Sequence, residues 1–349
     1  MAFWSQLPFH KDTFTNPDTA AQRMKKACED SDNGQWLEIG KSEEGRSIYG
    51  AILGNGPKTI SLIAGSHSDE PVGPETLRTL ISNIGTLEKK NPELFQQFTF
   101  LIIPHINPDG EAENWKWISD WPDLHSFIRH AYRELPGRDL EFGYPEMRVE
   151  NCAVAAFIQQ HAPVDLHMSL HGMAFSEGVM LLIERHWIDR TVALRESFID
   201  FVTKQGLSLH DHDRGGEKGF EYIGPGFTTT PEGRAMNKYF MEQGDPDTAG
   251  KFHLSSMEYV RTLDGDPLCL VTELPLFRVH FADERPTQKG VPEAYLEWKN
   301  KLPLLRAKLD RGESIENELQ LFHIQPLPLS TAMSIQLRAI ELALQIISK

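Results

Sequence analysis

Histidine and carboxylate side chains, the types that hold metal ions, stand at the ends of three apolar runs far apart in the chain. His67 and Glu70 lie three residues apart just after the first run, His171 ends the second, and Glu273 lies near the end of the third. A catalytic zinc ion takes three protein ligands from His, Asp and Glu and leaves a fourth position for water. We therefore predict that His67, Glu70 and His171 together bind one zinc ion.

The histidine that completes this set has an alternative. A His-x-x-Glu match alone is a weak signal, since a surface histidine and a glutamate at a helix start give the same pattern. His167 and His171 would share one face of a strand because side chains alternate along it. His171 is preferred because it lies nearer the strand end and Gly172 lets the backbone turn there. A second metal held by His167 or Asp165 is a less favoured alternative.

Glu273 is the candidate general base. A carboxylate between residues as apolar as those of the run 268–274 is costly to bury without a cation or a proton to balance it. Facing a zinc ion would remove that cost. A base in this place takes a proton from a metal-activated water molecule and passes it to the leaving group. The structural alternative is a glutamate paired with an arginine at the sheet edge.

Strands and helices that alternate along the chain must bring these side chains together. We expect strands at residues 47–53, 59–64, 98–103, 164–170, 178–183 and 268–274, and helices at 18–29, 74–84, 146–161, 188–205, 294–309 and 329–348. This order indicates an α/β sheet covered on both faces, with sites at the C-terminal ends of strands. The Trp-rich segment 115–121 is expected to be irregular or only partly helical, and 206–250 to form long loops.

Composition narrows the possible binding partners of the protein and the compartment in which it is found. A formal net charge of −15 argues against nucleic acid or an anionic membrane surface as the main partner. No apolar run reaches the length of a membrane span, and residues 1–6 lack the pattern of a signal peptide. Cys28, Cys152 and Cys269 are sparse and odd in number, which indicates unpaired thiols. We therefore expect a cytoplasmic protein.

Four segments resemble zinc carboxypeptidases in order and spacing. Residues 42–70, with Gly-Arg before one strand and His-Ser-Asp-Glu after the next, resemble the start of that family. Residues 107–110 are similar to the family's loop after the following strand, and 165–172 to its approach to the third zinc ligand. Residues 272–274 look like the strand that carries its catalytic glutamate. The similarity covers roughly residues 40–280.

The resemblance implies a fold and an activity. His67, Glu70 and His171 would bind one zinc ion, and Glu273 would be the general base of a hydrolase that cleaves a peptide or peptide-like amide bond. The implied fold is α/β, a mixed eight-stranded sheet between helices. We expect residues 1–285 to form this catalytic domain and 286–349 a helical C-terminal extension packed on it.

The chain departs from the family where substrate binds. Digestive members carry an arginine before the glutamate ligand, where this chain has Asp69. They also carry an Asn-Arg pair that grips the substrate's terminal carboxylate, and Glu141 and Phe142 stand in its place. A bidentate cation is the natural clamp for a carboxylate. The substitutes within reach in the sequence are Arg133, Arg138 and Arg148, whereas Glu141 would instead attract a cationic group such as an amine.

Other polar residues have less specific roles. Asn107 and Asp109 belong to an Asn-Pro-Asp-Gly sequence that favours a turn, and we expect them to shape the loop. Tyr259 is a rough counterpart of the family's substrate-contacting tyrosine. Residues 210–213, His-Asp-His-Asp, have a metal-like composition, but their polar surroundings favour a solvated loop or lid edge.

Two other functions fit the same pattern. One is an N-acyl amino acid deacylase, like the aspartoacylase and succinylglutamate desuccinylase branch of the fold, with an acyl amino acid in place of a peptide as substrate. The other is a zinc-binding pseudoenzyme that serves as a recognition module. Retention of Glu273 argues against the second, because a protein that only binds has no need for a base beside the metal.

Overall fold

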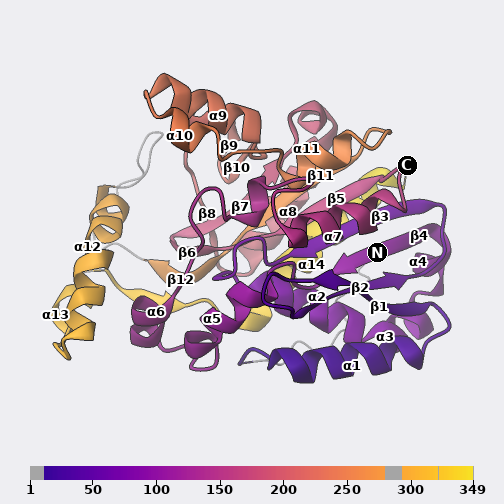
Figure 1. Cartoon of the computed structure of the whole chain (residues 1–349), viewed down its shortest axis with the longest axis horizontal. Helices are drawn as coiled ribbons and strands as arrows, with labels where there is room; N and C mark the ends of the chain where they lie inside the picture. Colours follow the sequence, from indigo (N-terminus) through magenta and orange to yellow (C-terminus); the bar gives the residue numbers. More distant parts are fainter. Residues whose placement is uncertain (1–11, 280–292, 321, 349) are drawn as a thin grey trace.

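The computed structural model describes residues 12–279, 293–320 and 322–348 (Figure 1). Its centre is a mixed sheet of ten strands within these described residues. In spatial order these are β1 (Gly34–Lys41), β2 (Ser47–Leu53), β4 (Phe98–Ile103), β3 (Lys58–Ala64), β5 (Leu166–Leu170), β11 (Leu268–Glu273), β7 (Gly178–Ile183), β10 (Phe227–Thr229) and β9 (Tyr222–Gly224), with β8 (Ser208–Leu209) paired to β7. A small second sheet joins β6 (Met173–Ser176), β12 (Pro275–Val279) and β13 (Ile324–Pro326).

Helices cover both faces of the large sheet. They are α1 (Pro17–Glu29), α2 (Val72–Ser82), α3 (Ile84–Lys90), α4 (Pro92–Gln97), α5 (Pro108–Ile118), α6 (Leu124–His130), α7 (Val149–Gln159), α8 (Val192–Lys204), α9 (Gly233–Glu242), α10 (Pro246–Ala249), α11 (Ser256–Arg261), α12 (Glu293–Asp310), α13 (Glu316–Leu319) and α14 (Leu329–Ile347). Helices α2 and α14 pack on β3 and β5 from one side, and α7 and α11 pack on β1 and β5 from the other.

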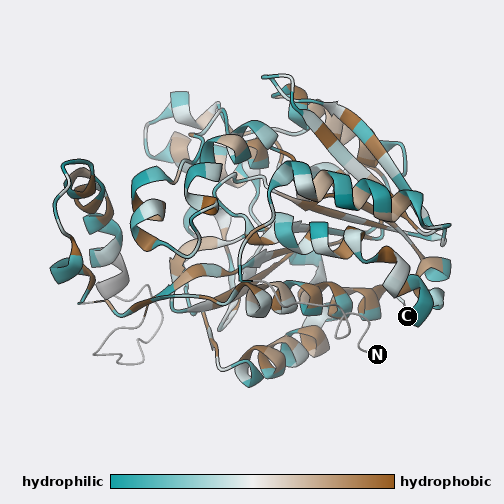
Figure 2. Ribbon diagram, turned by 90° about the horizontal axis from the view of Figure 1, so that it is seen from below, coloured by the Kyte–Doolittle hydropathy of each residue, from teal (hydrophilic) through white to brown (hydrophobic). Residues whose placement is uncertain are grey.

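Strand β3 shows why the central strands are apolar throughout. Ile60 and Leu62 point into the core under α2 and α14, whereas Ile63 belongs to the core under α7. Successive side chains of a strand face opposite sides, so a strand covered on both faces needs apolar residues at nearly every position. Hydrophobic residues accordingly gather in the strands and on the inner faces of the helices (Figure 2).

The parallel strands at the centre bring the candidate site residues to one edge. Strands β3, β5 and β11 run parallel as neighbours, with Ala64 opposite Leu170 and Leu170 opposite Thr272. Their C-terminal ends therefore lie side by side. The loops that leave β3 and β5 and the last residue of β11 meet at this edge, as expected for an α/β sheet.

The predicted fold class, a mixed sheet between helices, is confirmed, and the expected strands are all present. The sheet is wider than the eight strands we expected, because short strands β8, β9 and β10 extend it within residues 206–250, where we expected only loops. The Trp-rich segment 115–121 is only partly helical, as expected, because α5 ends at Ile118, but the helix begins earlier than the sequence indicated. Asn107 accepts a hydrogen bond from the Gly110 N–H at 3.0 Å and Pro108 takes the first helical position, so a regular helix, α5, begins there.

The division into residues 1–285 and 286–349 stays a prediction. Its boundary falls in residues 280–292, outside the described residues. Helix α14 packs against α2, α8, β5 and β11, and β13 pairs with β12. No helix in the described ranges is both long and apolar enough to cross a membrane.

Candidate metal centre

Three side chains that could hold a metal converge at the C-terminal ends of β3 and β5. His67 Nδ1 lies 3.0 Å from one carboxylate oxygen of Glu70, and His171 Nδ1 lies 3.0 Å from the other. The two Nδ1 atoms are 3.2 Å apart. Ligands bound to zinc at 2.0–2.1 Å in tetrahedral geometry lie about 3.3 Å from one another. The spacing and the His₂Glu donor set therefore fit a single zinc ion.

Backbone geometry allows this close approach. Gly65 has φ +79°, and a Cβ there would come within 2.5 Å of the His105 ring. Gly172 donates its N–H to the Glu70 carboxylate at 3.0 Å, and a Cβ on it would come within 3.0 Å of the Leu274 carbonyl. The two glycines thus let the loops after β3 and β5 turn tightly beside the cluster.

Charge stabilises the ionised form of the Glu70 carboxylate. Its burial alone would raise its pKa, but His67, Arg133 and the hydrogen bond to His171 outweigh burial and hold the pKa well below its usual value. An ionised carboxylate is the form that ligates a metal. Glu70 is therefore held in the state that zinc binding requires.

The opposite nitrogen of His67 faces two further carboxylates. His67 Nε2 lies 3.3 Å from an Asp139 oxygen and 3.1 Å from a Glu141 oxygen. Asp139 begins a short 3₁₀ turn, and its side chain accepts the Glu141 N–H at 2.9 Å. A carboxylate on the second nitrogen of a metal-binding histidine fixes the ring and makes the ligand more basic. Glu141 therefore lies against His67, whereas the sequence left open that it attracts a cation on the substrate.

Glu273 ends β11 beside this cluster. Its Oε2 is buried and makes no hydrogen bond within the described part of the chain. Burial, and next the negative charge of Glu70, raise the pKa of Glu273 to about 8, against the positive charges of His171 and His67. The oxygen of this carboxylate that makes no hydrogen bond is free to take up a proton. No arginine pairs with it among the described salt bridges, so the structural alternative finds no support.

His167 does not join the cluster. Its Nδ1 lies 3.0 Å from Ser61 Oγ and its Nε2 lies 3.0 Å from Ser256 Oγ, so both nitrogens are occupied by hydroxyl groups. Asp165 accepts the Thr59 N–H at 2.8 Å. Among the described residues the groups spaced to hold a metal are His67–Glu70–His171 and His67–Asp139–Glu141. His171 is thus the histidine that the structure places beside His67 and Glu70.

One of the three candidate arginines reaches the site. Arg133 donates from Nε to Asp69 at 2.8 Å and from Nη2 to Glu70. Asp69 and Arg133 therefore form an ion pair at the very position where digestive members have an arginine before the ligand. Sequence reasoning named Arg133 but had no signal to prefer it, because the contact spans more than 60 residues.

The other two arginines form hydrogen bonds with residues outside the cluster. Arg138 pairs with Glu43, and Arg148 donates to Glu150 at 2.8 Å and to the Arg138 carbonyl at 3.0 Å. Neither of these partners belongs to the cluster. The carboxylate clamp that the sequence lacks is therefore not rebuilt from these two arginines.

The remaining polar candidates have structural roles. Tyr259 is buried and donates to the Ala155 carbonyl at 3.2 Å. Asp109 accepts from the Ser42 hydroxyl at 2.6 Å and also binds Arg46, which supports its expected role in shaping the loop. His210 is buried and its Nδ1 lies 2.8 Å from Glu177, so this part of residues 210–213 is not a solvated loop.

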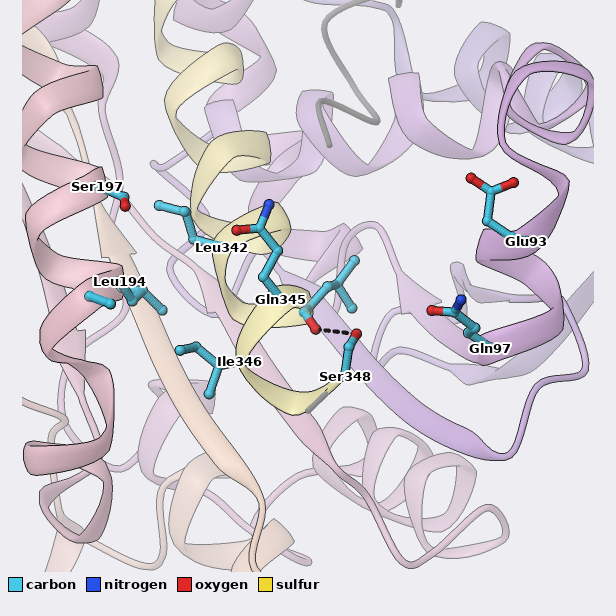
Figure 3. Close-up of a pocket in the computed structure, with 10 residues that line it drawn as sticks. Glu93, Gln97, Leu194, Ser197, Leu342, Gln345, Ile346 and Ser348 are labelled. Atoms are coloured by element: carbon cyan, nitrogen blue, oxygen red, sulfur yellow. Dashed lines mark hydrogen bonds between the residues drawn. The ribbon is translucent and has the colours of Figure 1, made fainter.

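A separate pocket of about 450 Å³ lies between α8 and the end of α14 (Figure 3). Its lining includes Leu194, Leu342 and Ile346, and it contains none of the metal-cluster residues. This pocket is therefore distinct from the candidate metal centre.

Comparison with known proteins finds similarity to zinc carboxypeptidases. The sequence model of zinc carboxypeptidases matches residues 22–145. Zinc carboxypeptidase A 1 of Drosophila melanogaster is 26% identical over 172 residues, which cover 41% of this chain and 40% of that protein. The inactive metallocarboxypeptidase ECM14 of Ajellomyces dermatitidis is 37% identical over 97 residues, or 25% of this chain and 16% of that protein.

Solved structures share the fold. Bovine thrombin-activatable fibrinolysis inhibitor, in complex with tick carboxypeptidase inhibitor, aligns with a TM-score of 0.56 at 14% identity over 97% of this chain and 98% of the other. Carboxypeptidase A from Helicoverpa armigera aligns with a TM-score of 0.50 at 12% identity over 97% and 77%. At such identities the likeness shows a common fold.

The mixed sheet between helices has the metallocarboxypeptidase fold. The chain is similar in sequence to zinc carboxypeptidases over residues 22–145, and its fold is theirs over 97% of its length. The matches span less than half the length of these curated relatives, and one of them is named inactive. This similarity favours zinc as the metal, whereas catalysis has to be argued from the residues of this chain.

Proposed function

We propose that the protein is a zinc-dependent hydrolase of a peptide or peptide-like amide bond. The observation that carries the proposal is the convergence of His67 Nδ1, the Glu70 carboxylate and His171 Nδ1 within 3.2 Å of one another, beside a glutamate with an unpaired oxygen. Bound there, zinc would supply a Lewis acid for the scissile carbonyl and would acidify a water molecule. One ion per chain fits this donor set.

Glu273 is the proton carrier in this proposal. Its unpaired Oε2 is free to take a proton from the attacking water and to deliver it to the leaving nitrogen. A positive ion held by His67, Glu70 and His171 would lower the pKa of Glu273 from about 8, so that the carboxylate is ionised and acts as a base near neutral pH.

Arg133 supplies the positive charge on the substrate side. Its side chain is 42% exposed although its Nε and Nη2 are bound to Asp69 and Glu70. This anchoring holds the guanidinium beside the cluster. A fixed guanidinium can donate to the carbonyl oxygen as negative charge develops on it, or to a substrate carboxylate.

The substrate is a peptide or an acyl amino acid, and the place of action is the cytoplasm. Glu141 and Phe142 stand where the family has its Asn-Arg clamp, and here Glu141 contacts His67 and Phe142 packs in the core. The lack of a clamp favours a substrate whose terminal carboxylate is blocked or is held only by Arg133. The unpaired state of Cys28, Cys152 and Cys269 supports a reducing compartment.

The decisive experiment combines metal content with turnover. Wild type, His171→Ala and Glu273→Gln are analysed for zinc and assayed on peptides with free or blocked C-termini and on N-acyl amino acids. We expect about one zinc in wild type, loss of zinc in His171→Ala, and retained zinc in Glu273→Gln with turnover reduced by about 10²–10⁴.

Each other result selects a different function. Turnover of acyl amino acids alone would indicate the deacylase. Zinc without turnover of any substrate would indicate a binding module, as the inactive relatives suggest. Absence of zinc from wild type, even after zinc is supplied, would reject the hydrolase.

A further inference from the structure

A buried amide on α14 touches three segments that carry the metal centre. Gln336 is fully buried. Its Oε1 lies 2.6 Å from the Thr76 hydroxyl on α2, and its Nε2 lies 3.3 Å from the His171 carbonyl and 3.3 Å from the Thr272 hydroxyl. These partners are 260, 165 and 64 residues away in sequence. One side chain thus joins the helix after β3 to the ends of β5 and β11.

The chemistry of the partners fixes the orientation of the amide. A carbonyl oxygen only accepts hydrogen bonds, so the NH₂ group of Gln336 must face the His171 carbonyl. Its two protons then serve His171 and Thr272, and its oxygen accepts from Thr76. The reverse orientation would place two acceptor oxygens against each other.

Two of the three contacts lie at or beside a residue of the proposed site, and the third lies on the helix that follows the Glu70 loop. Thr76 is in α2, which begins at Val72 just after Glu70. The second contact is the backbone of the ligand His171 itself, and Thr272 directly precedes Glu273. The His171 N–H also donates to the Thr272 carbonyl at 3.0 Å. The Gln336 side-chain amide therefore adds to the hydrogen bonds that join the ends of β5 and β11.

Packing alone does not account for a glutamine here. Burying an amide is unfavourable unless its groups are hydrogen-bonded, and most buried residues of α14 are apolar. All three heavy-atom contacts of Gln336 are made to the scaffold of the site. A side chain that satisfies groups on three separate segments restricts how far those segments can move apart.

We propose that Gln336 is a positioning residue for the metal centre. It holds the ends of β5 and β11 and the start of α2 in register, so that His171, Glu273 and the Glu70 loop keep the spacing that zinc binding and proton transfer require. The inference rests on the proposed zinc site. Through Gln336, the C-terminal helix α14 is part of the functional centre, although it lies outside the residues that match the family model.

The test is a Gln336→Met variant of the full chain. Met keeps the length and removes every hydrogen bond. We expect zinc to dissociate about tenfold faster into excess chelator, since remote partners of metal ligands change affinity by 10–100-fold. We also expect kcat to fall with KM nearly unchanged, and the visible absorption bands of the cobalt-substituted protein to shift.

Two further variants separate positioning from stability. Thr272→Val removes one contact and keeps the shape, so it should give a smaller change in the same direction and keeps the test open if Gln336→Met does not fold. Leu342→Ala is the matched control, because Leu342 is buried on the same helix but faces the pocket shared with α8 (Figure 3). It should lower the midpoint of unfolding and leave zinc dissociation and the cobalt spectrum unchanged.

The outcomes distinguish the inference from the proposed function. Unchanged zinc dissociation and kcat in both Gln336→Met and Thr272→Val would overturn the positioning role, as would an equal zinc loss in Leu342→Ala. A wild type that binds zinc but cleaves no substrate would reject only the hydrolase, because zinc retention by the variants still decides the role of Gln336. A wild type that binds no zinc would overturn both.

Discussion

At the scale of single residues, the surroundings of His67 are the most unusual part of the site. One ring nitrogen faces Glu70 and His171, and the other faces the two carboxylates of Asp139 and Glu141. The pKa of His67 is raised well above its usual value, because Glu70 and Asp139 outweigh the opposing effects of burial and Arg133. Two negative groups on the outer nitrogen make His67 a strongly basic ligand.

Removing these carboxylates should weaken the metal site in steps. We expect Asp139→Asn or Glu141→Gln to lower zinc affinity by about 10-fold and the double variant by up to about 100-fold, because a neutral amide orients the ring but adds no charge. Competition with a chelator of known affinity measures this. Glu43→Gln is the control, since Glu43 binds Arg138 and Arg148 away from the cluster. Zinc affinities equal to wild type in the double variant would contradict a role for this pair.

At the scale of elements, His167 joins three of them. It lies fully buried on β5, between Ser61 on β3 and Ser256 on α11. Burial lowers its pKa to about 3. The titratable groups of the metal cluster lie at the end of the strand, whereas both neighbours of His167 are neutral hydroxyls. His167 is therefore a structural link that stays uncharged in the folded protein.

Because buried His167 stays uncharged, we predict that the folded protein loses stability in acid. In the unfolded chain His167 takes up a proton near its ordinary pKa of about 6.5, whereas the folded protein does so only near 3, so stability is lost as pH falls through this window. At pH 5 the loss is about 2 kcal/mol relative to pH 8. Urea unfolding at both pH values should show this difference in wild type and a correspondingly smaller one in His167→Gln. Equal pH dependence in the two proteins would refute it.

The sequence predicted those parts of the site that depend on one rule. Strand ends that carry His67, His171 and Glu273 meet because parallel neighbours share an edge, and apolar runs reveal such strands. Contacts between segments far apart in the chain have no comparable pattern in the sequence. Arg133 reaches Glu70 across 63 residues, and Gln336 reaches His171 across 165. Helix α5 was missed because Asn107-Pro108 serves a turn and a helix start equally well.

At the scale of the whole molecule, the C-terminal segment decides how many folding units the chain has. Of the 19 residues of α14, 13 are buried, and they cover the face of the sheet formed by β5 and β11. A helix this apolar is stable only inside a core. The predicted boundary at residue 285 would therefore separate a sheet from one of its own covering layers, and not one independent domain from another.

A fragment of residues 1–285 should accordingly fail to fold by itself. Without α14 it exposes the apolar face under β5 and β11, leaves the His171 carbonyl and two threonine hydroxyls without Gln336, and loses β13 from β12. We expect it to aggregate or to unfold without a cooperative transition, as seen by circular dichroism in urea, and to retain no zinc. Adding residues 286–349 as a separate chain should restore both properties at least partly, because the contacts are non-covalent. A fragment that unfolds cooperatively and binds one zinc would instead show that residues 1–285 form a domain and that α14 only strengthens it.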